Sequence, residues 1–326
     1  MAFMPSPARR GRDQGVYDMM RYFVVRRARV LFLVVALLAV PCSSYALTWS
    51  PLQIAIWEPV QVFNRETSIY GARVNLIYGV NKDVYGIDVG LVNRATGKVG
   101  GIQVSPFTNI AGKDLLGIQV SWFNFAYVSN GGGAQLGLIN YIERGEFTGL
   151  QISGFNISGN ATLRGVQLSI SCNMGGDING IQMAAFYNGN KGDMNGLQVA
   201  GLINDIDDGN VRGIQLALGN YVDDDLSGIQ AGIVNYANKV NGFQASAFIG
   251  ACNYMNGLQV GGVSVTSKDV YGMQIGFINS ADRVKGVQIG IINYTRRMRG
   301  VQIGVVNIIS EGMVPFFPGF NASMSF

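Results

Sequence analysis

The stretch G-M-Q-I-G-F-I-N, from Gly272 to Asn279, recurs as G-V-Q-I-G-I-I-N from Gly286 and as G-V-Q-I-G-V-V-N from Gly300. Sixteen such copies follow one another up to Asn307, with 14 to 17 residues between successive leading glycines. Those glycines are Gly71, Gly86, Gly101, Gly117, Gly133, Gly149, Gly165, Gly180, Gly196, Gly213, Gly228, Gly242, Gly257, Gly272, Gly286 and Gly300. A short fixed period indicates a repeat architecture, in which each unit packs only against its neighbours.

Each repeat has the pattern of a strand. With the leading glycine numbered 0, position +2 is Gln in fourteen copies, the exceptions being Arg73 and Asp88. Positions +1 and +3 are mostly Ile, Val, Leu or Met, and an Asn usually follows at +7 or +8. This alternation predicts a half-buried strand, and a glycine in every repeat argues against helix.

Position −2 determines how the strand is expected to lie. It is apolar in nearly every repeat, as in Val84, Leu115 and Phe147, although it shares a face with 0 and +2 in an unbroken strand. We therefore expect a bend near the glycine, with residues −2, +1, +3 and about +5 or +6 facing inward. Such units predict a β-solenoid of about sixteen 14–17-residue coils, roughly 75 Å long at 4.8 Å per coil.

Stacked coils place identical residues above one another, so two structural ladders are expected. Asn side chains would form a column that bonds internally and to the corner backbone, and Gln at +2 would form a second ladder on an outer face. Three consecutive members of each ladder are Gln198, Gln215 and Gln230, and Asn204, Asn220 and Asn235.

The competing fold is a 16-stranded outer-membrane β-barrel, acting as a pore or a passive scaffold. Strands about every 15 residues and an alternating C-terminus from Phe320 to Phe326 fit it. Adjacent repeats, however, do not alternate in character as up and down strands would. Charges are also almost confined to the turns. These observations favour the solenoid.

The N-terminal segment resembles an export signal. Arg26, Arg27 and Arg29 precede the apolar run 30–40, and Ala46 offers a cleavage point. We therefore expect residues 1–46 to be a signal peptide, followed by an N-terminal cap (47–70), the repeats (71–309) and a C-terminal cap (310–326). Atypical end units would cover the open strand edges of a solenoid.

Charge and composition argue against several functions. Residues 1–46 hold seven of the 24 basic and two of the 20 acidic residues, which leaves 24 − 7 = 17 basic and 20 − 2 = 18 acidic residues. A nearly neutral chain of this kind is not expected to bind nucleic acid. Histidine is absent from the sequence, which removes the usual general base. No catalytic residue and no cofactor are predicted.

Two features concern metals and thiols. A weak candidate calcium site is formed by the acidic residues of two adjacent turns, because stacking would bring their carboxylates together. These residues are Asp205, Asp207, Asp208, Asp223, Asp224 and Asp225. Cys172 and Cys252 lie five repeats apart, roughly 24 Å in a stack, so two buried free thiols are expected.

The tandem G-φ-Q-φ-G-φ-φ-N units (φ, apolar) behind a signal peptide resemble a group of largely uncharacterised bacterial surface-repeat proteins. The resemblance covers residues 71–307 and includes R-V-N-L-I-Y-G-V-N from Arg73 to Asn81. It implies export to the outer membrane or cell surface and transfers no catalytic residue.

The leading functional hypothesis is a non-enzymatic envelope protein whose rigid repeats serve display, adhesion or structural spacing. Its partner would be an unknown surface ligand or envelope component, bound through one weak contact per coil, and outer-membrane association is an open alternative. A solenoid hydrolase or lyase with an acidic site is a third and weaker hypothesis.

Overall fold

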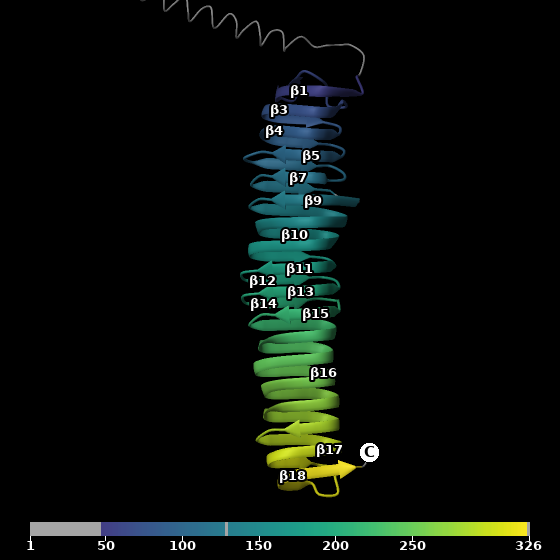
Figure 1. Cartoon of the computed structure of the whole chain (residues 1–326), viewed down its shortest axis with the longest axis vertical. Coiled ribbons are helices and arrows are strands. Elements are labelled where there is room, and N and C mark those ends of the chain that lie inside the picture. The colour runs from purple at the N-terminus through teal and green to yellow at the C-terminus, as the bar shows by residue number, and fades with distance from the viewer. Residues whose placement is uncertain (1–46, 128–129, 325–326) are drawn as a thin grey trace, which may run out of the picture.

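The computed structural model describes residues 47–127 and 130–324, which form a slender rod of stacked coils (Figure 1). The first coils lie at one end of the rod and the last coils at the other, because the chain climbs by one coil with each repeat. The expected signal peptide, residues 1–46, and Phe326 lie outside the described residues.

Eighteen strands are formed by these described residues. They are β1 (Trp49–Trp57), β2 (Val60–Gln61), β3 (Ser68–Asn81), β4 (Val84–Ala95), β5 (Val99–Val104), β6 (Thr108–Ala111), β7 (Leu116–Val120), β8 (Phe123–Ala126), β9 (Asn130–Leu136), β10 (Ile139–Gly175), β11 (Ile178–Ala184), β12 (Tyr187–Asn190), β13 (Met194–Ala200), β14 (Ile203–Ile206), β15 (Val211–Leu216), β16 (Gly219–Ile289), β17 (Ile292–Ile309) and β18 (Phe316–Met324). β10 and β16 each extend through several coils, because strand pairing there continues around the corners.

Successive coils pair in parallel and in register, one repeat above the next. Gly180 of β11 lies opposite Gly165 and Gly196, and Gln182 lies opposite Gln167 and Gln198. The shorter strands make a second parallel stack, in which Asn188 of β12 pairs with Asn173 and Asn204. The predicted β-solenoid is therefore confirmed. The barrel alternative is wrong, because a barrel of this kind pairs neighbouring strands antiparallel.

The predicted orientation of the side chains, in contrast, is inverted. Gln at +2 was expected on an outer face, yet Gln103 and Gln119 are fully buried. Positions +1 and +3 were expected inside, yet Ile87 is 55% exposed and Val89 44% exposed. The inversion is possible because the buried Gln and Asn side chains of the two columns hydrogen-bond mostly to the amide above or below them, which removes most of the cost of burying a polar group.

The glycine at position 0 does not reverse the alternation. β15 passes through Gly213, with Val211 and Gln215 buried and Ile214 exposed, as in one continuous strand. Gly213 has φ +144°, and a Cβ there would lie 1.9 Å from the carbonyl oxygen of Gly196. The glycine column is thus required by both the backbone conformation and the close approach of the coil below.

The interior is divided lengthwise into an apolar half and an amide half. The apolar half contains the −2 residues, such as Leu163 and Met194, and, in many repeats, the residue two places after the Asn, such as Ile206 and Val222. The amide half contains the Gln and Asn columns. Apolar packing therefore occupies one side of the cross-section and hydrogen-bonded amides the other.

The two ends of the stack are covered differently. At the start, β1 pairs in parallel with β3 and antiparallel with β2. At the finish, β18 folds back antiparallel on β17 and places Asn321 opposite Gln302. Across 47–127 and 130–324, no helix is long and apolar enough to cross a membrane.

Candidate functional site

The glutamine ladder is continuous along the repeats. Each Gln after the first, Gln103, donates its Nε2–H to the Oε1 of the Gln one coil closer to the N-terminus. Gln215 donates to Gln198 at 2.8 Å and Gln230 to Gln215 at 3.1 Å. The members are Gln103, Gln119, Gln135, Gln151, Gln167, Gln182, Gln198, Gln215, Gln230, Gln244, Gln259, Gln274, Gln288 and Gln302. The predicted ladder exists, but it is inside the rod.

The asparagine ladder runs with the opposite polarity. Asn204 donates its Nδ2–H to Oδ1 of Asn220 at 2.9 Å, and Asn220 donates to Asn235 at 2.8 Å, toward the C-terminus. Asn204 also donates to the backbone oxygen of Leu216 at 3.0 Å. The predicted column that bonds both itself and the corner backbone is confirmed. Beyond Asn235, where the next repeats lack an in-phase Asn, the acceptor is Ser246 Oγ.

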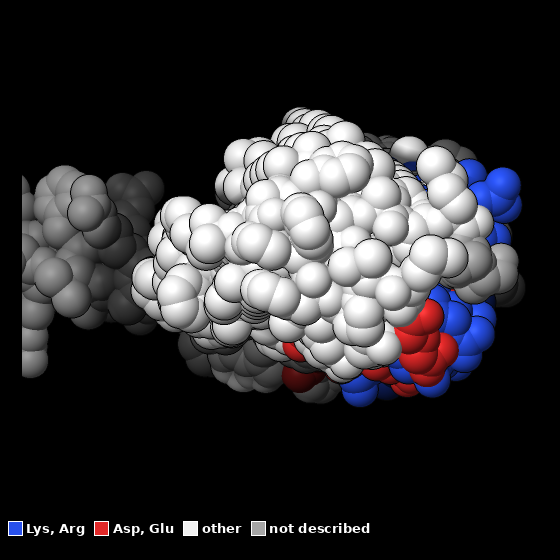
Figure 2. All heavy atoms as spheres, turned by 90° about the horizontal axis from the view of Figure 1, so that it is seen from below, with Lys and Arg blue, Asp and Glu red and all other residues white. Residues whose placement is uncertain are grey.

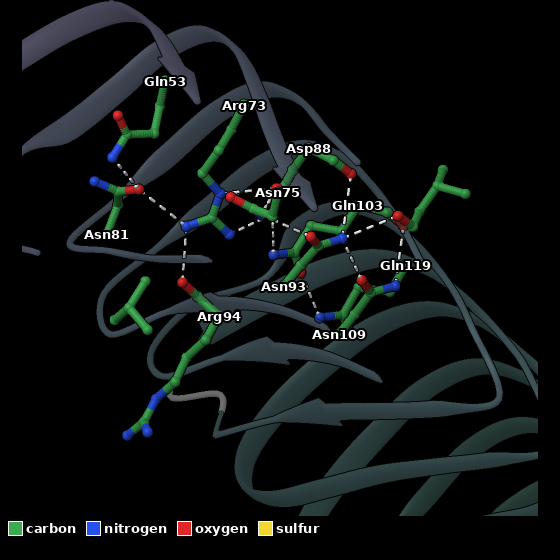
Figure 3. A network of polar contacts seen from close by, with 12 residues as sticks. Gln53, Arg73, Asn75, Asn81, Asp88, Asn93, Arg94, Gln103, Asn109 and Gln119 are labelled. Atoms are coloured by element: carbon green, nitrogen blue, oxygen red, sulfur yellow. Dashed lines mark hydrogen bonds and ion pairs between the residues drawn. The ribbon is translucent and has the colours of Figure 1, made fainter. Parts of the chain in front are cut away.

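At its N-terminal end the glutamine ladder terminates on a buried ion pair, shown in Figure 3. Asp88 accepts from Gln103 Nε2 at 2.8 Å, from Asn75 Nδ2 at 3.1 Å and from two nitrogens of the Arg73 guanidinium. Both charged side chains are fully buried. Arg73 also donates to the backbone oxygen of Arg94 at 2.9 Å. The carboxylate and the guanidinium thus have hydrogen-bond partners on several sides.

This ion pair was missed by the sequence reasoning, although its signal was present. Arg73 and Asp88 are the two departures from Gln at +2, and they occur in consecutive repeats. In an in-register stack, consecutive +2 residues are neighbours, and opposite charges there predict a pair.

Among the buried side-chain oxygens that have no hydrogen-bond partner, three belong to ladder amides, and the polarity of the ladders explains these three. They are Oε1 of Gln302, Oδ1 of Asn75 and Oδ1 of Asn279. Gln302 is the last member of the glutamine ladder, and the two asparagines begin the two segments of the asparagine ladder. In a ladder where every amide donates in the same direction, the first donor has no amide behind it, so its own oxygen accepts no ladder hydrogen bond.

The exterior around the amide half is apolar. We call the outward side chains at +1, +3, +5 and +6 of the sixteen repeats the apolar face. From position 0 to +7 of these repeats, Arg73 and Asp88 are the only charged residues, and both are internal. The most exposed side chains include Ile170 (77%), Phe277 (67%) and Phe248 (62%). Figure 2 shows the charged side chains gathered on one side of the end-on view.

The acidic turns do not gather into an ion site. Asp205 accepts from the Tyr187 hydroxyl at 3.0 Å, Asp223 from the Tyr221 hydroxyl at 3.3 Å, and Asp225 lies 3.7 Å from Lys239 Nζ. Within the described ranges, no group of three or more acidic or thiol side chains could hold a metal ion. These contacts give three of the six candidate carboxylates, those of Asp205, Asp223 and Asp225, separate partners.

Burial shifts the pKa values of Tyr187 and Asp205, which are hydrogen-bonded to each other. It raises the pKa of Tyr187 to about 12, with a further contribution from the Asp205 carboxylate. Burial also raises the pKa of Asp205, whereas the hydrogen bond from Tyr187 lowers it. The pair is half-buried and hydrogen-bonded, so it anchors two neighbouring coils.

The basic side chains near the C-terminus are engaged from coil to coil. Arg283 contacts Asp269 at 2.6 Å, and Arg296 contacts Asp282 at 2.7 Å, each one repeat away. Each exposed ion pair of this kind contributes little to stability. Because each pair joins residues one repeat apart, the pairs match the in-register stacking of the coils.

Both described cysteines are free thiols, as predicted. Cys252 is buried, and burial raises its pKa to about 11. Cys172 is only partly buried, which departs from the expectation. Cys252 therefore lacks the lowered pKa and the exposed setting of a reactive cysteine.

Comparisons with known proteins give no family assignment. No family model matches the chain, and no significant match was found among curated proteins or solved structures. The resemblance to surface-repeat proteins therefore remains a prediction, and what is established is a β-solenoid with stacked Asn and Gln ladders.

Proposed function

We propose that this chain is a non-enzymatic structural rod of a bacterial cell envelope, serving display, adhesion or spacing. The observation that carries the proposal is the uninterrupted in-register stack. Fourteen glutamines in succession use their side chains to hold one coil on the next.

The distribution of polar groups supports the same reading. The buried amides and the Arg73–Asp88 pair are engaged in ladder hydrogen bonds, and many charged turn residues form pairs between coils. A repeat whose polar side chains hold the stack together is suited to setting length and presenting a surface. The export part of the proposal rests on residues 1–46 and on the resemblance described above.

The test is to express the full chain with a C-terminal tag in a Gram-negative host, fractionate the cells and image the purified protein. We expect an envelope-associated product whose N-terminal residue is Leu47. Negative-stain images should show rods roughly 75 Å long at 4.8 Å per coil. An unprocessed cytosolic product would contradict the envelope assignment. Turnover of acidic polysaccharides by the purified rod would contradict the non-enzymatic one.

A further inference from the structure

We propose that the apolar face of the rod lies against the surface of an anionic lipid bilayer, with the rod axis parallel to the membrane. This inference rests on the proposed function, because an envelope rod is one that meets a bilayer, but the vesicle test below does not depend on export. It starts from the inverted cross-section, in which apolar side chains surround the amide half of the interior.

The first argument is the size and shape of the apolar face. Its exposed side chains continue along the rod, from Ile87 near one end to Val305 near the other. They also turn the corner, because Trp122, Phe248 and Phe277 project at +5 or +6, beyond the strand that carries +1 and +3. Exposed apolar surface on this scale marks a site of interaction. A second copy stacked on the flat +1 and +3 strands would leave the corner uncovered, whereas a fluid bilayer can cover both.

The second argument is that the backbone beneath this face is already satisfied. At the corner, Leu138 N donates to Trp122 O at 2.9 Å, and Phe155 N donates to Leu138 O at 2.9 Å. Backbone groups that hydrogen-bond within the protein lose no hydrogen bond when they are removed from water. A lipid environment imposes this condition.

The third argument is the chemistry of the two borders. Position −1, just across the glycine from the apolar face, holds four charged residues, and all are basic: Arg164, Arg212, Lys285 and Arg299. All four are exposed. The other border, directly after the Asn, carries Tyr141, Tyr221, Tyr236 and Tyr294. Basic side chains complement anionic headgroups, and tyrosines are enriched where hydrocarbon meets water.

A hollow on the apolar face offers space for lipid. Near the N-terminal end, Ile54, Val74, Leu76, Val89 and Val104 contribute to the lining of a cavity of about 520 Å³. An aliphatic lining without charge suits part of an acyl chain rather than a polar ligand.

The experiment uses the full chain and a reporter confined to the face. The chain has three tryptophans, of which Trp122 is on the corner and 57% exposed. In Trp49→Phe/Trp57→Phe, Trp122 is the sole reporter, and its fluorescence is followed with vesicles of phosphatidylcholine and phosphatidylglycerol containing brominated lipid. The matched control also carries Trp122→Phe and Ser267→Trp, which moves the reporter to an exposed position of β16 beside Lys268 and outside the apolar face.

We expect Trp122 fluorescence to shift to the blue and to be quenched by brominated lipid, while the reporter at position 267 is not quenched. Phe248→Glu/Phe277→Glu should weaken vesicle binding about tenfold or more, whereas Asn160→Glu/Ser267→Glu, with the same added charge at exposed positions outside the apolar face, should not. Binding should be stronger to these vesicles than to pure phosphatidylcholine.

Several results would overturn the proposal. One is flotation of the chain with vesicles while Trp122 stays unquenched, because residues 1–46 would then hold it there. Another is a blue-shifted Trp122 without lipid, accompanied by oligomers that Phe248→Glu/Phe277→Glu dissolves, which would assign the face to a second copy. Equal binding to neutral and anionic vesicles would remove the role of the basic border. A processed, rod-shaped protein that does not bind the vesicles would refute this inference without contradicting the proposed function.

Discussion

Gln103 donates its Nε2–H to Oδ2 of Asp88 at 2.8 Å, so the glutamine ladder ends on a carboxylate. A charged acceptor makes this last hydrogen bond stronger than a bond between two neutral amides. The charge is in turn held by Arg73, which is fully buried with it. The first coils therefore depend on an ion pair where the later coils depend on amides.

Breaking this pair on one side should destabilise the N-terminal coils strongly. Asp88→Ala leaves the Arg73 guanidinium buried without its partner, a loss of about 3–5 kcal/mol. Arg73→Gln/Asp88→Gln restores the residue found at +2 elsewhere and should recover most of it. Denaturant unfolding, with protease protection of the first coils, measures both. A double variant as unstable as Asp88→Ala would show that the ladder cannot extend to this end.

The glycine column can be tested at one coil. Gly286 has φ +147°, and a Cβ there would meet the Gly272 carbonyl oxygen at 1.8 Å, so Gly286→Ala should cost about 3 kcal/mol or more. Gly219 provides the control, because its nearest neighbour would be 3.8 Å from the added Cβ. Gly219→Ala should change the thermal unfolding midpoint little. Equal effects would mean that close stacking of the glycines is not what limits the repeat.

The buried thiol predicts a dependence on alkaline pH. The pKa of Cys252 rises from 9.0 to about 11 on folding, because burial disfavours the thiolate. Folding therefore favours the protonated thiol, and this contribution is fully present below pH 9 and lost as the pH rises through about 11. The shift corresponds to about 3 kcal/mol at most. The difference in unfolding free energy between the unsubstituted chain and Cys252→Ala, measured by denaturant unfolding at each pH, should shrink over that range.

Whole coils should be removable when the register is kept. Deleting residues 180–227 joins Asn179 to Gly228 and removes three coils, because Asn179, Asn195, Arg212 and Ser227 are register partners in succession. The product should fold, and its maximum dimension in X-ray scattering should be about 14 Å shorter. Deleting residues 180–220 instead joins Asn179 to Tyr221 out of phase and should abolish cooperative unfolding. A folded out-of-phase product would contradict the ladder account.

The repeat period predicted the architecture, but not which side of the strand faces inward. Strictly parallel, in-register coils follow from copies such as those at Gly272, Gly286 and Gly300, because identical residues can then stack. The inward face was wrong because apolar residues such as Ile87 and Val89 were assumed to be buried in preference to Gln. That assumption led to an expected bend at the glycine. In the structure, the buried −2 residue and the buried Gln at +2 lie on the same face of one continuous strand, as Val211 and Gln215 do.

The candidate site, too, was predicted only in part from the sequence. The amide ladders at Gln198 and Asn204 could be anticipated, because a column of identical amides can satisfy itself. The apolar face could not, since its recognition required knowing that Gln points inward. The carboxylates of Asp205 and Asp223 were expected to lie close together from the repeat register, and the sequence did not indicate that each would accept a hydrogen bond from a tyrosine hydroxyl.

The opposed polarity of the two ladders has an electrostatic consequence. In an α-helix, aligned amide dipoles add and leave partial charges at the two ends. Here fourteen Gln donate toward the N-terminus and the Asn column donates toward the C-terminus, so their side-chain dipoles point in opposite directions along the axis. The two contributions oppose each other in every coil that carries both amides, but not between Asn235 and Asn279, where the asparagine ladder is interrupted and the glutamine ladder continues. Adding repeats that carry both amides therefore lengthens the rod with little gain in side-chain macrodipole, whereas repeats without the Asn would add to it.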